Sequence, residues 1–189
     1  MSCTEIYGLK KNSVVCIGET RNAWRGAMAV WKIIEKKYLP KFVPKWGSPC
    51  EEYSRTTCLG SDKGLEEIWD LYKSPRLPRA ERIVLGSTFD NVLVKVDRIA
   101  ELLSAFREFE GETSLKEQAD IIERTVREDP EIVAIGWNQT SVNGDTWATE
   151  NYDEKEDVHR GYNLETGTKH WFLLEKIDNL QASPIPVSS

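Results

Sequence analysis

Two short runs rich in β-branched residues open the chain and flank a polar turn. They are EIYGL at 5–9 and SVVCIG at 13–18, with Lys10, Lys11 and Asn12 between them. Runs of this length on either side of a short polar turn are typical of a β-hairpin. We therefore expect the first 18 residues to form two antiparallel strands.

The next periodic stretch has the spacing of an amphipathic helix. Its apolar side chains recur along one stripe at Trp24, Ala27, Met28, Trp31, Ile34 and Tyr38. This spacing predicts a helix over residues 22–38 with its tryptophans facing the core. Asn22 suits the N-cap position, and Pro40 ends the helix.

Four further segments show the helical period, near residues 65–72, 78–87, 97–110 and 114–129. Ser114 and Glu117 have the capping-box spacing that begins the last of these helices. Strands are predicted at NVLVKV (91–96), EIVAIGW (131–137) and TKHWFLL (168–174).

This order of elements predicts one α+β domain over residues 1–180. We expect a small antiparallel or mixed sheet packed against about five helices, with a flexible tail at 181–189.

Composition narrows the class of protein without identifying a reaction. The 189 residues are 40% hydrophobic and 30% charged, which is typical of one soluble globular domain. We expect no membrane span, because no run approaches the roughly 18 apolar residues that one needs. The start of the chain lacks the apolar segment of a secretory signal, and the four cysteines form no C-x-x-C pair. Reduced thiols in the cytoplasm are therefore expected.

Charge is distributed unevenly along the chain. Residues 1–48 hold nine Lys or Arg against three Asp or Glu, whereas residues 101–165 hold six against seventeen. Such a chain can carry two faces of opposite field. The alternative is that these charges only solvate helical surfaces.

The first candidate site lies at the start of the helix predicted over residues 22–38. Arg21, Asn22 and Arg25 fall off its apolar stripe, beside the unpaired N–H groups of a helix N-terminus. Those N–H groups attract anions, and two arginines add charge-assisted hydrogen bonds to phosphate or carboxylate. The alternative is that both arginines pair with acidic side chains of a neighbouring element.

The second candidate site is GWNQTSVNGDTW, at residues 136–147 after a buried strand. It places polar side chains between two tryptophans whose rings can stack on a ligand, giving the set Trp137, Asn138, Gln139, Thr140, Asn143 and Trp147. Together with the arginines, this set suits a phosphorylated ring such as a nucleotide. It also suits a protein partner, because Trp and Arg are enriched at binding hot spots. An ordinary polar loop remains the alternative.

No catalytic signature stands out, so an enzyme is not the favoured interpretation. The sequence has two histidines, His159 and His170, and the Walker, nucleophile-elbow, zinc-protease and dinucleotide motifs are absent. His170 lies in an apolar run, where a structural role is commoner. The acidic loop at 150–157 offers carboxylates for a divalent cation, although such loops are usually only solvated. We expect no cofactor.

Three segments resemble parts of small proteins encoded by bacteriophages and prophages. They are GETRNAWRGAMAVWKIIEKKYLP (18–40), ERIVLGSTFDNVLVK (81–95) and AIGWNQTSVNGDTW (134–147). The resemblance implies a cytoplasmic protein of the infected bacterium that blocks host defence. It would bind a host defence protein or complex, or sequester a small nucleotide signal. The resemblance assigns no functional residue.

Two alternatives to this inhibitor remain open. Residues 101–165 can act as an acidic decoy of nucleic acid, while direct binding of nucleic acid is not expected from so acidic a chain. The loop at 150–157 can support a metal-assisted enzyme. The sequence leaves the oligomeric state open, and a homo-oligomer is compatible with it.

Overall fold

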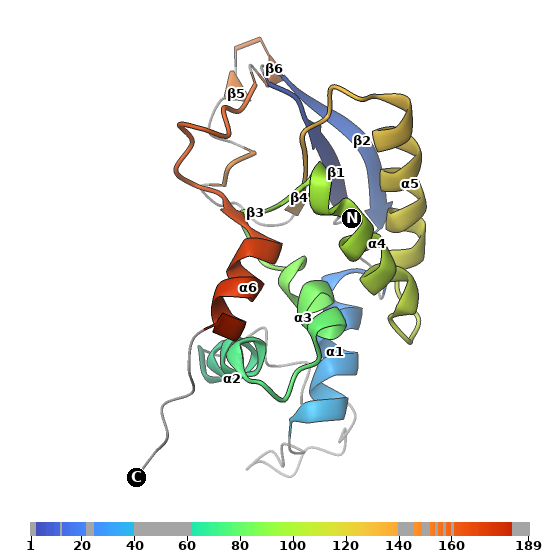
Figure 1. Ribbon diagram of the computed structural model, residues 1–189, viewed down its shortest axis with the longest axis vertical. Helices are drawn as coiled ribbons and strands as arrows, with labels where there is room; N and C mark the ends of the chain where they lie inside the picture. The colour runs from blue at the N-terminus through green and yellow to red at the C-terminus, as the bar shows by residue number, and fades with distance from the viewer. Residues whose placement is uncertain are drawn as a thin grey trace.

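A computed structural model describes residues 3–11, 13–21, 25–39, 62–139, 146–148, 152–153, 155–156, 158–159 and 161–182. Within these residues the chain forms a five-stranded mixed sheet, six α-helices and a separate two-stranded sheet (Figure 1). The predicted α+β class is therefore confirmed.

Antiparallel pairing builds most of the large sheet, and a short fifth strand is parallel to its neighbour. The order across the sheet is β2 (Val14–Arg21), β1 (Cys3–Leu9), β4 (Ala134–Gln139), β3 (Val92–Lys95) and β7 (Trp171–Phe172). The predicted hairpin is confirmed, because β1 pairs with β2 and the Lys10 N–H donates to the Ser13 carbonyl across the turn. The first strand of the chain thus lies between β2 and β4.

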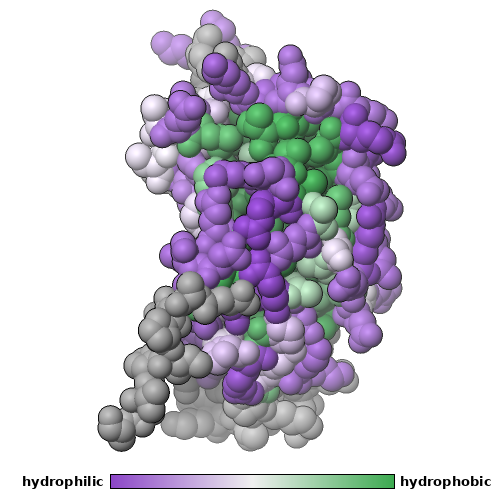
Figure 2. All heavy atoms as spheres, viewed as in Figure 1, coloured by the Kyte–Doolittle hydropathy of each residue, from purple (hydrophilic) through white to green (hydrophobic). Residues whose placement is uncertain are grey.

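The helices are α1 (Ala27–Tyr38), α2 (Asp62–Lys73), α3 (Arg79–Gly86), α4 (Ile99–Glu108), α5 (Leu115–Glu128) and α6 (Leu173–Ala182). A 3-10 turn, Val96–Arg98, leads into α4, and β5 (Tyr152–Asp153) pairs with β6 (Val158–His159). In the view of Figure 2, hydrophilic side chains cover the outer side of α5, and hydrophobic ones gather near the β1–β2 hairpin.

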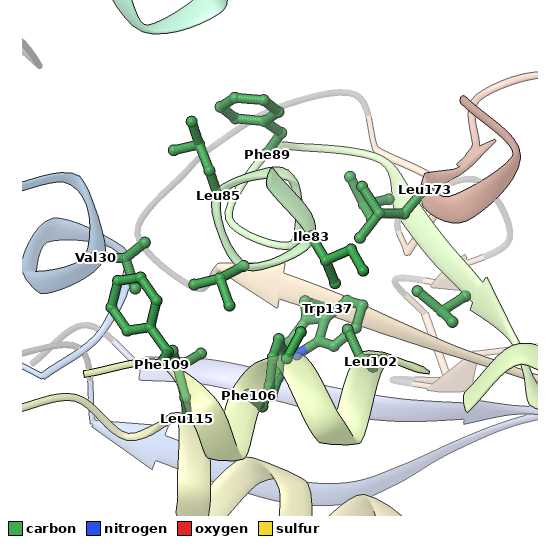
Figure 3. Close-up of a cluster of buried hydrophobic side chains, with 14 of the residues drawn as sticks. Val30, Ile83, Leu85, Phe89, Leu102, Phe106, Phe109, Leu115, Trp137 and Leu173 are labelled. Atoms are coloured by element: carbon green, nitrogen blue, oxygen red, sulfur yellow. The ribbon is translucent and has the colours of Figure 1, made fainter. Parts of the chain in front are cut away.

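Alternate residues of β4 face opposite sides of the sheet, and both sides are covered. On the helix side, Ile135 and Trp137 join the main core, part of which is drawn in Figure 3. On the other side, Ala134 belongs to a smaller core around Trp147 and Tyr162. Because both faces are buried, this strand has a continuous apolar run instead of a strict alternation.

Helix α1 begins later than its apolar period predicts. It starts at Ala27 with Gly26 as its N-cap, so Asn22 does not cap it. Met28, predicted on the buried stripe, is 36% exposed. The cause is a tertiary contact, since the Ser114 N–H donates to the Arg25 carbonyl (2.8 Å) and fixes the chain just before the helix. Trp24 lies outside the described residues.

Trp31 is buried, as the helical spacing predicts. Its Nε1–H donates to Thr88 Oγ1 (2.8 Å), and its ring meets Phe89 edge to face at 6.1 Å. The indole thus joins α1 to the end of α3.

The prediction of a strand over residues 168–174 is wrong for most of that range. Only Trp171 and Phe172 pair with β3, and α6 then begins at Leu173. Leu173 and Ile177 are fully buried, which is the spacing of one helical turn. A short apolar run fits a strand or a buried helix equally well, so periodicity alone did not distinguish them. The helix ends at Ala182, and residues 183–189 of the predicted tail lie outside the described residues.

Four charged side chains form a closed ring that joins α3, the 3-10 turn, α4 and α6. Arg79 of α3 and Arg98 of the 3-10 turn each contact both Glu101 of α4 and Asp178 of α6. Hydrogen bonds from Arg79 and then Arg98 lower the pKa of the Glu101 carboxyl. Hydrogen bonds from Arg98 and then Arg79 lower the pKa of the Asp178 carboxyl.

Replacing Trp31 should test the packing of α1. Trp31→Ala removes a buried indole and should lower the free energy of unfolding by about 3–5 kcal/mol. Met28→Ala, on the exposed side of the same helix, should change it by no more than about 0.5 kcal/mol. Urea unfolding measures both variants, and equal effects would mean that the helix is rotated from its described position.

The charge ring predicts how stability depends on pH. Both carboxyl groups have a lower pKa in the folded state, so they stabilise the protein at neutral pH. This stabilisation is lost as the pH falls below the ordinary carboxyl pKa of about 4 and through the lowered folded values. In Arg98→Gln the fall in unfolding free energy between about pH 6 and pH 3 should be smaller. Arg124→Gln on α5 serves as the control and should keep the wild-type pH dependence.

Candidate functional site

The two candidate segments of the sequence meet at one end of the sheet. Strand β2 ends at Arg21, opposite Cys3, and strand β4 ends at Gln139, opposite Thr4. Their backbones therefore lie one strand to either side of the start of β1, although 118 positions separate them in the sequence. The sequence analysis combined these two segments into one site, which requires them to lie close together. The pairing of β1 with both β2 and β4 brings them together.

Helix α1 starts close to this end of the sheet without a side-chain cap. Gly26 is the N-cap and has no side chain to offer, and its carbonyl accepts from the Ala29 N–H at 3.0 Å. The first N–H groups of a helix carry a partial positive charge and have no partner within the helix. The first turn of α1 contains no acidic residue that would neutralise that charge.

A small pocket of about 20 Å³ lies beside this helix start. Thr4 of β1, Trp137 of β4 and Gln118 of α5 line one part of it, and Arg25, Gly26 and Ala27 line another. Its volume corresponds to one or two water molecules, at roughly 10–15 Å³ each. The pocket therefore has room for one small polar group and not for a ring.

A chain of hydrogen bonds fixes the polar wall of the pocket. Trp137 Nε1–H donates to Gln118 Oε1 (3.0 Å), and Gln118 Nε2–H donates to Ser114 Oγ (3.0 Å). The Ser114 hydroxyl then donates to the Arg25 carbonyl (3.2 Å). Ser114 is the N-cap of α5 as predicted, but its hydroxyl makes this contact instead of capping the helix. We call this chain of hydrogen bonds the Trp137–Arg25 relay.

Sequence reasoning missed Gln118 and Thr4. Gln118 is 6% exposed and lies one turn from Leu115 and Ile122 on the apolar stripe of α5. A polar residue on an otherwise apolar stripe is the signal that indicates a buried hydrogen bond. Thr4 gives no such signal. Its neighbour across the hairpin, Thr20, is 2% exposed, and the Thr20 hydroxyl has no hydrogen-bond partner among the described residues.

Arg25 lines the pocket, and its guanidinium makes only two weak contacts with described residues. Its side chain is 55% exposed, and its Nη1 lies 3.9 Å from the exposed Glu117 carboxylate. Nη2 donates a long hydrogen bond to the Thr113 carbonyl (3.3 Å). Exposed pairs of this kind are worth little, so the guanidinium can exchange them for another anion.

The two tryptophans of the second segment are buried on opposite sides of the sheet. Trp137 is 7% exposed and Trp147 is 1% exposed. The Trp147 ring lies over Gly136, where an added Cβ would come within 2.6 Å of it. The stacking role predicted for these rings does not fit the structure, because neither ring presents a free face.

Asn138 lies on the side of the sheet away from the helices. Its Nδ2–H donates to Glu5 Oε2 (3.1 Å), which also accepts from the Tyr7 hydroxyl (2.8 Å). The sheet thus separates Asn138 and Trp147 from Arg25 and the pocket. Asn22, Thr140 and Asn143 lie outside the described residues, as do the side chains of Arg21 and Gln139.

The structure gives no support to a catalytic role for His170 or for the acidic loop at 150–157. His170 Nδ1 lies 2.7 Å from the hydroxyl of the buried Tyr162, and its ring packs against Phe172. Of the acidic side chains at 150–157, only that of Glu156 is described, and the rest fall outside. Across the described part of the chain, no three His, Cys, Asp or Glu side chains come together as metal ligands.

Comparisons of the chain with family models, curated proteins and solved structures gave no match. Among the helices described, none has the length and apolar character needed to cross a bilayer.

The Trp137–Arg25 relay can be tested by a double-mutant cycle. Trp137→Phe removes the donor and leaves Gln118 Oε1 buried without a partner, which should cost about 1–3 kcal/mol of unfolding free energy. Gln118→Leu leaves the indole N–H unpaired and should cost a similar amount. The double variant should be destabilised by clearly less than the sum of the two. Additive losses in chemical denaturation would contradict a direct hydrogen bond.

Proposed function

We propose that this protein is a non-catalytic inhibitor, encoded by a bacteriophage or prophage, that binds a host defence protein in the bacterial cytoplasm. The resemblance to small phage proteins supports the biological class. The start of α1, which has no side-chain cap and no acidic residue in its first turn, and the exposed Arg25 beside it support action by binding an anionic group. An acidic side chain of the partner would supply that group.

The size of the pocket favours a protein partner over a nucleotide messenger. A volume of about 20 Å³ admits a carboxylate at the helix start and leaves no room for a base or a sugar. Trp137 and Trp147 are both buried, so they do not offer the stacking surface that a nucleotide base requires. A carboxylate presented by a folded partner needs only the helix start and the guanidinium.

The acidic-decoy alternative receives less support. A decoy of nucleic acid needs a row of free negative charges, yet several carboxylates in the described part of 101–165 are paired. Arg79 and Arg98 hold Glu101, Arg107 holds Asp120 and Glu123, and Lys10 holds Asp129 and Glu131. The metal-assisted enzyme on the loop at 150–157 has no structural argument in its favour, since most of that loop lies outside the described residues.

The proposed function can be tested in bacteria that each carry one defence system. Hosts expressing the protein should regain sensitivity to phage for at least one system, and the purified target should bind the protein directly. If no system is inhibited and no target is bound, the proposal is wrong. Complete inhibition at a ratio of protein to target far below one to one would indicate catalytic turnover and would also contradict the proposal.

The role of the helix start is tested by Arg21→Ala combined with Arg25→Ala. Each charge-assisted hydrogen bond is worth about 1.5–3 kcal/mol, so affinity for the target should fall about a hundredfold or more. The free energy of unfolding should change by no more than about 0.5 kcal/mol, since the Arg25 side chain is exposed and Arg21 is predicted to lie off the apolar stripe. Arg124→Ala with Arg127→Ala, two exposed arginines of α5, is the matched control and should keep full affinity. If the Arg21 and Arg25 variant binds the target as tightly as the wild type, the helix start is not part of the interface. If that variant unfolds, the two arginines have a structural role.

A further inference from the structure

A second surface lies further along α1, toward its C-terminal end. It is a groove of about 400 Å³ between α1, α3 and the end of α4. Its apolar walls come from Ile33, Pro78, Ala80, Ala105 and Phe109. This volume is some twentyfold that of the pocket at the helix start, and it lies within the usual range for binding sites of about 300–1,000 Å³.

The charges at this groove are unbalanced. Glu108 and Glu110 line it, and both are exposed. Neither forms an ion pair with a described Lys or Arg, and Glu108 accepts a hydrogen bond only from the neutral Ser104 hydroxyl (2.6 Å). Among the described lining residues the single cation is Lys37, which is engaged by Glu81. The groove therefore combines an apolar floor with two uncompensated negative charges.

We infer that this groove receives a basic amphipathic helix of the protein partner. Apolar side chains of that helix would fill the space between Ile33 and Phe109, and a flanking Lys or Arg would pair with Glu108 and Glu110. Helix-in-groove recognition works through apolar anchors one turn apart, and complementary charges set the orientation. The inference rests on the proposed function and names the chemistry of the partner that the protein binds.

The groove and the helix start belong to one continuous surface. Residues 109–114 run beside α1 and connect the two sites. Phe109 lines the groove, the Gly111 backbone packs against Ile33, and Ser114 holds the Arg25 carbonyl. From Ala27 to Lys37 helix α1 rises about 15 Å, which a partner helix of about 10 residues can span. Such a helix would place an acidic group at Arg25 and a basic group at the groove. Figure 3 shows Val30, Phe109 and Leu115 meeting between α1 and this connection.

A model peptide tests the groove directly with the full chain. The probe is a fluorescent 14-residue helix with leucines at helical spacing and lysines beside them, and its control carries glutamates in place of the lysines. We expect the lysine peptide to bind at least tenfold more tightly in fluorescence anisotropy. Amide shifts in nuclear magnetic resonance should gather at α1, α3 and residues 105–110. Equal binding of both peptides, or shifts centred elsewhere, would overturn the inference.

Charge reversal provides the matched pair of variants. Glu108→Lys with Glu110→Lys should weaken the lysine peptide at least tenfold. Glu128→Lys with Glu165→Lys changes the net charge equally at two other exposed positions and should retain binding within about twofold. Ala80→Trp fills the groove and should also abolish binding, while its circular dichroism shows whether it folds. Full binding by a folded Ala80→Trp variant would contradict an occupied groove.

The same variants separate this inference from the proposed function. If the Glu108 and Glu110 reversal keeps full inhibition of host defence while the Arg21 and Arg25 variant loses it, the function stands and the groove inference fails. If the wild-type protein is a dimer that the reversal makes monomeric, the occupant is a second copy and the inference also fails. Loss of both peptide binding and host inhibition, in a folded monomer, supports it.

Discussion

The position of α1 depends on the Trp137–Arg25 relay. The relay begins at an indole on the central strand β4, passes through Gln118 and Ser114 of the α5 segment, and ends on the backbone that precedes α1. Each member is a polar group inside or beside an apolar core, where an unpaired donor or acceptor is costly. The relay therefore holds α1 to the sheet and to α5, and it sets where the helix begins. Both proposed binding surfaces lie on that helix, so their geometry depends on these three hydrogen bonds.

Much of the fold could be predicted from local pattern. The β1–β2 hairpin and the burial of Trp31 follow from the alternation of residues and from helical spacing, which nearby positions determine. The start of α1 could not be predicted in this way, because it depends on Ser114, a residue 89 positions away. The strand predicted over 168–174 failed for a related reason. Its apolar run is too short for a period to emerge, and packing of Leu173 and Ile177 against the core makes it helical.

The candidate site could be predicted only in part. Sequence reasoning placed Arg25 beside a helix start and off the apolar stripe, and the structure places it there. It also grouped Trp137 and Trp147 as rings that can stack on one ligand, whereas the sheet lies between them and both are buried. A tryptophan in a polar loop gives no sign that a glycine on the neighbouring strand β4, here Gly136, makes space for its ring. The charge blocks could not be interpreted from the sequence either, because it does not show which carboxylates form ion pairs, as Asp120 and Glu123 do with Arg107, and which lie at the groove, as Glu108 and Glu110 do.

Hydrogen exchange on the complex with the host target most directly tests whether α1 and its surroundings form the binding surface. Peptides covering residues 25–37 and 105–114 should exchange more slowly when the target is bound. Peptides from residues 161–172 and from α6, on other parts of the molecule, should exchange at unchanged rates. Protection confined to those other regions, with α1 unaffected, would contradict a binding surface along this helix.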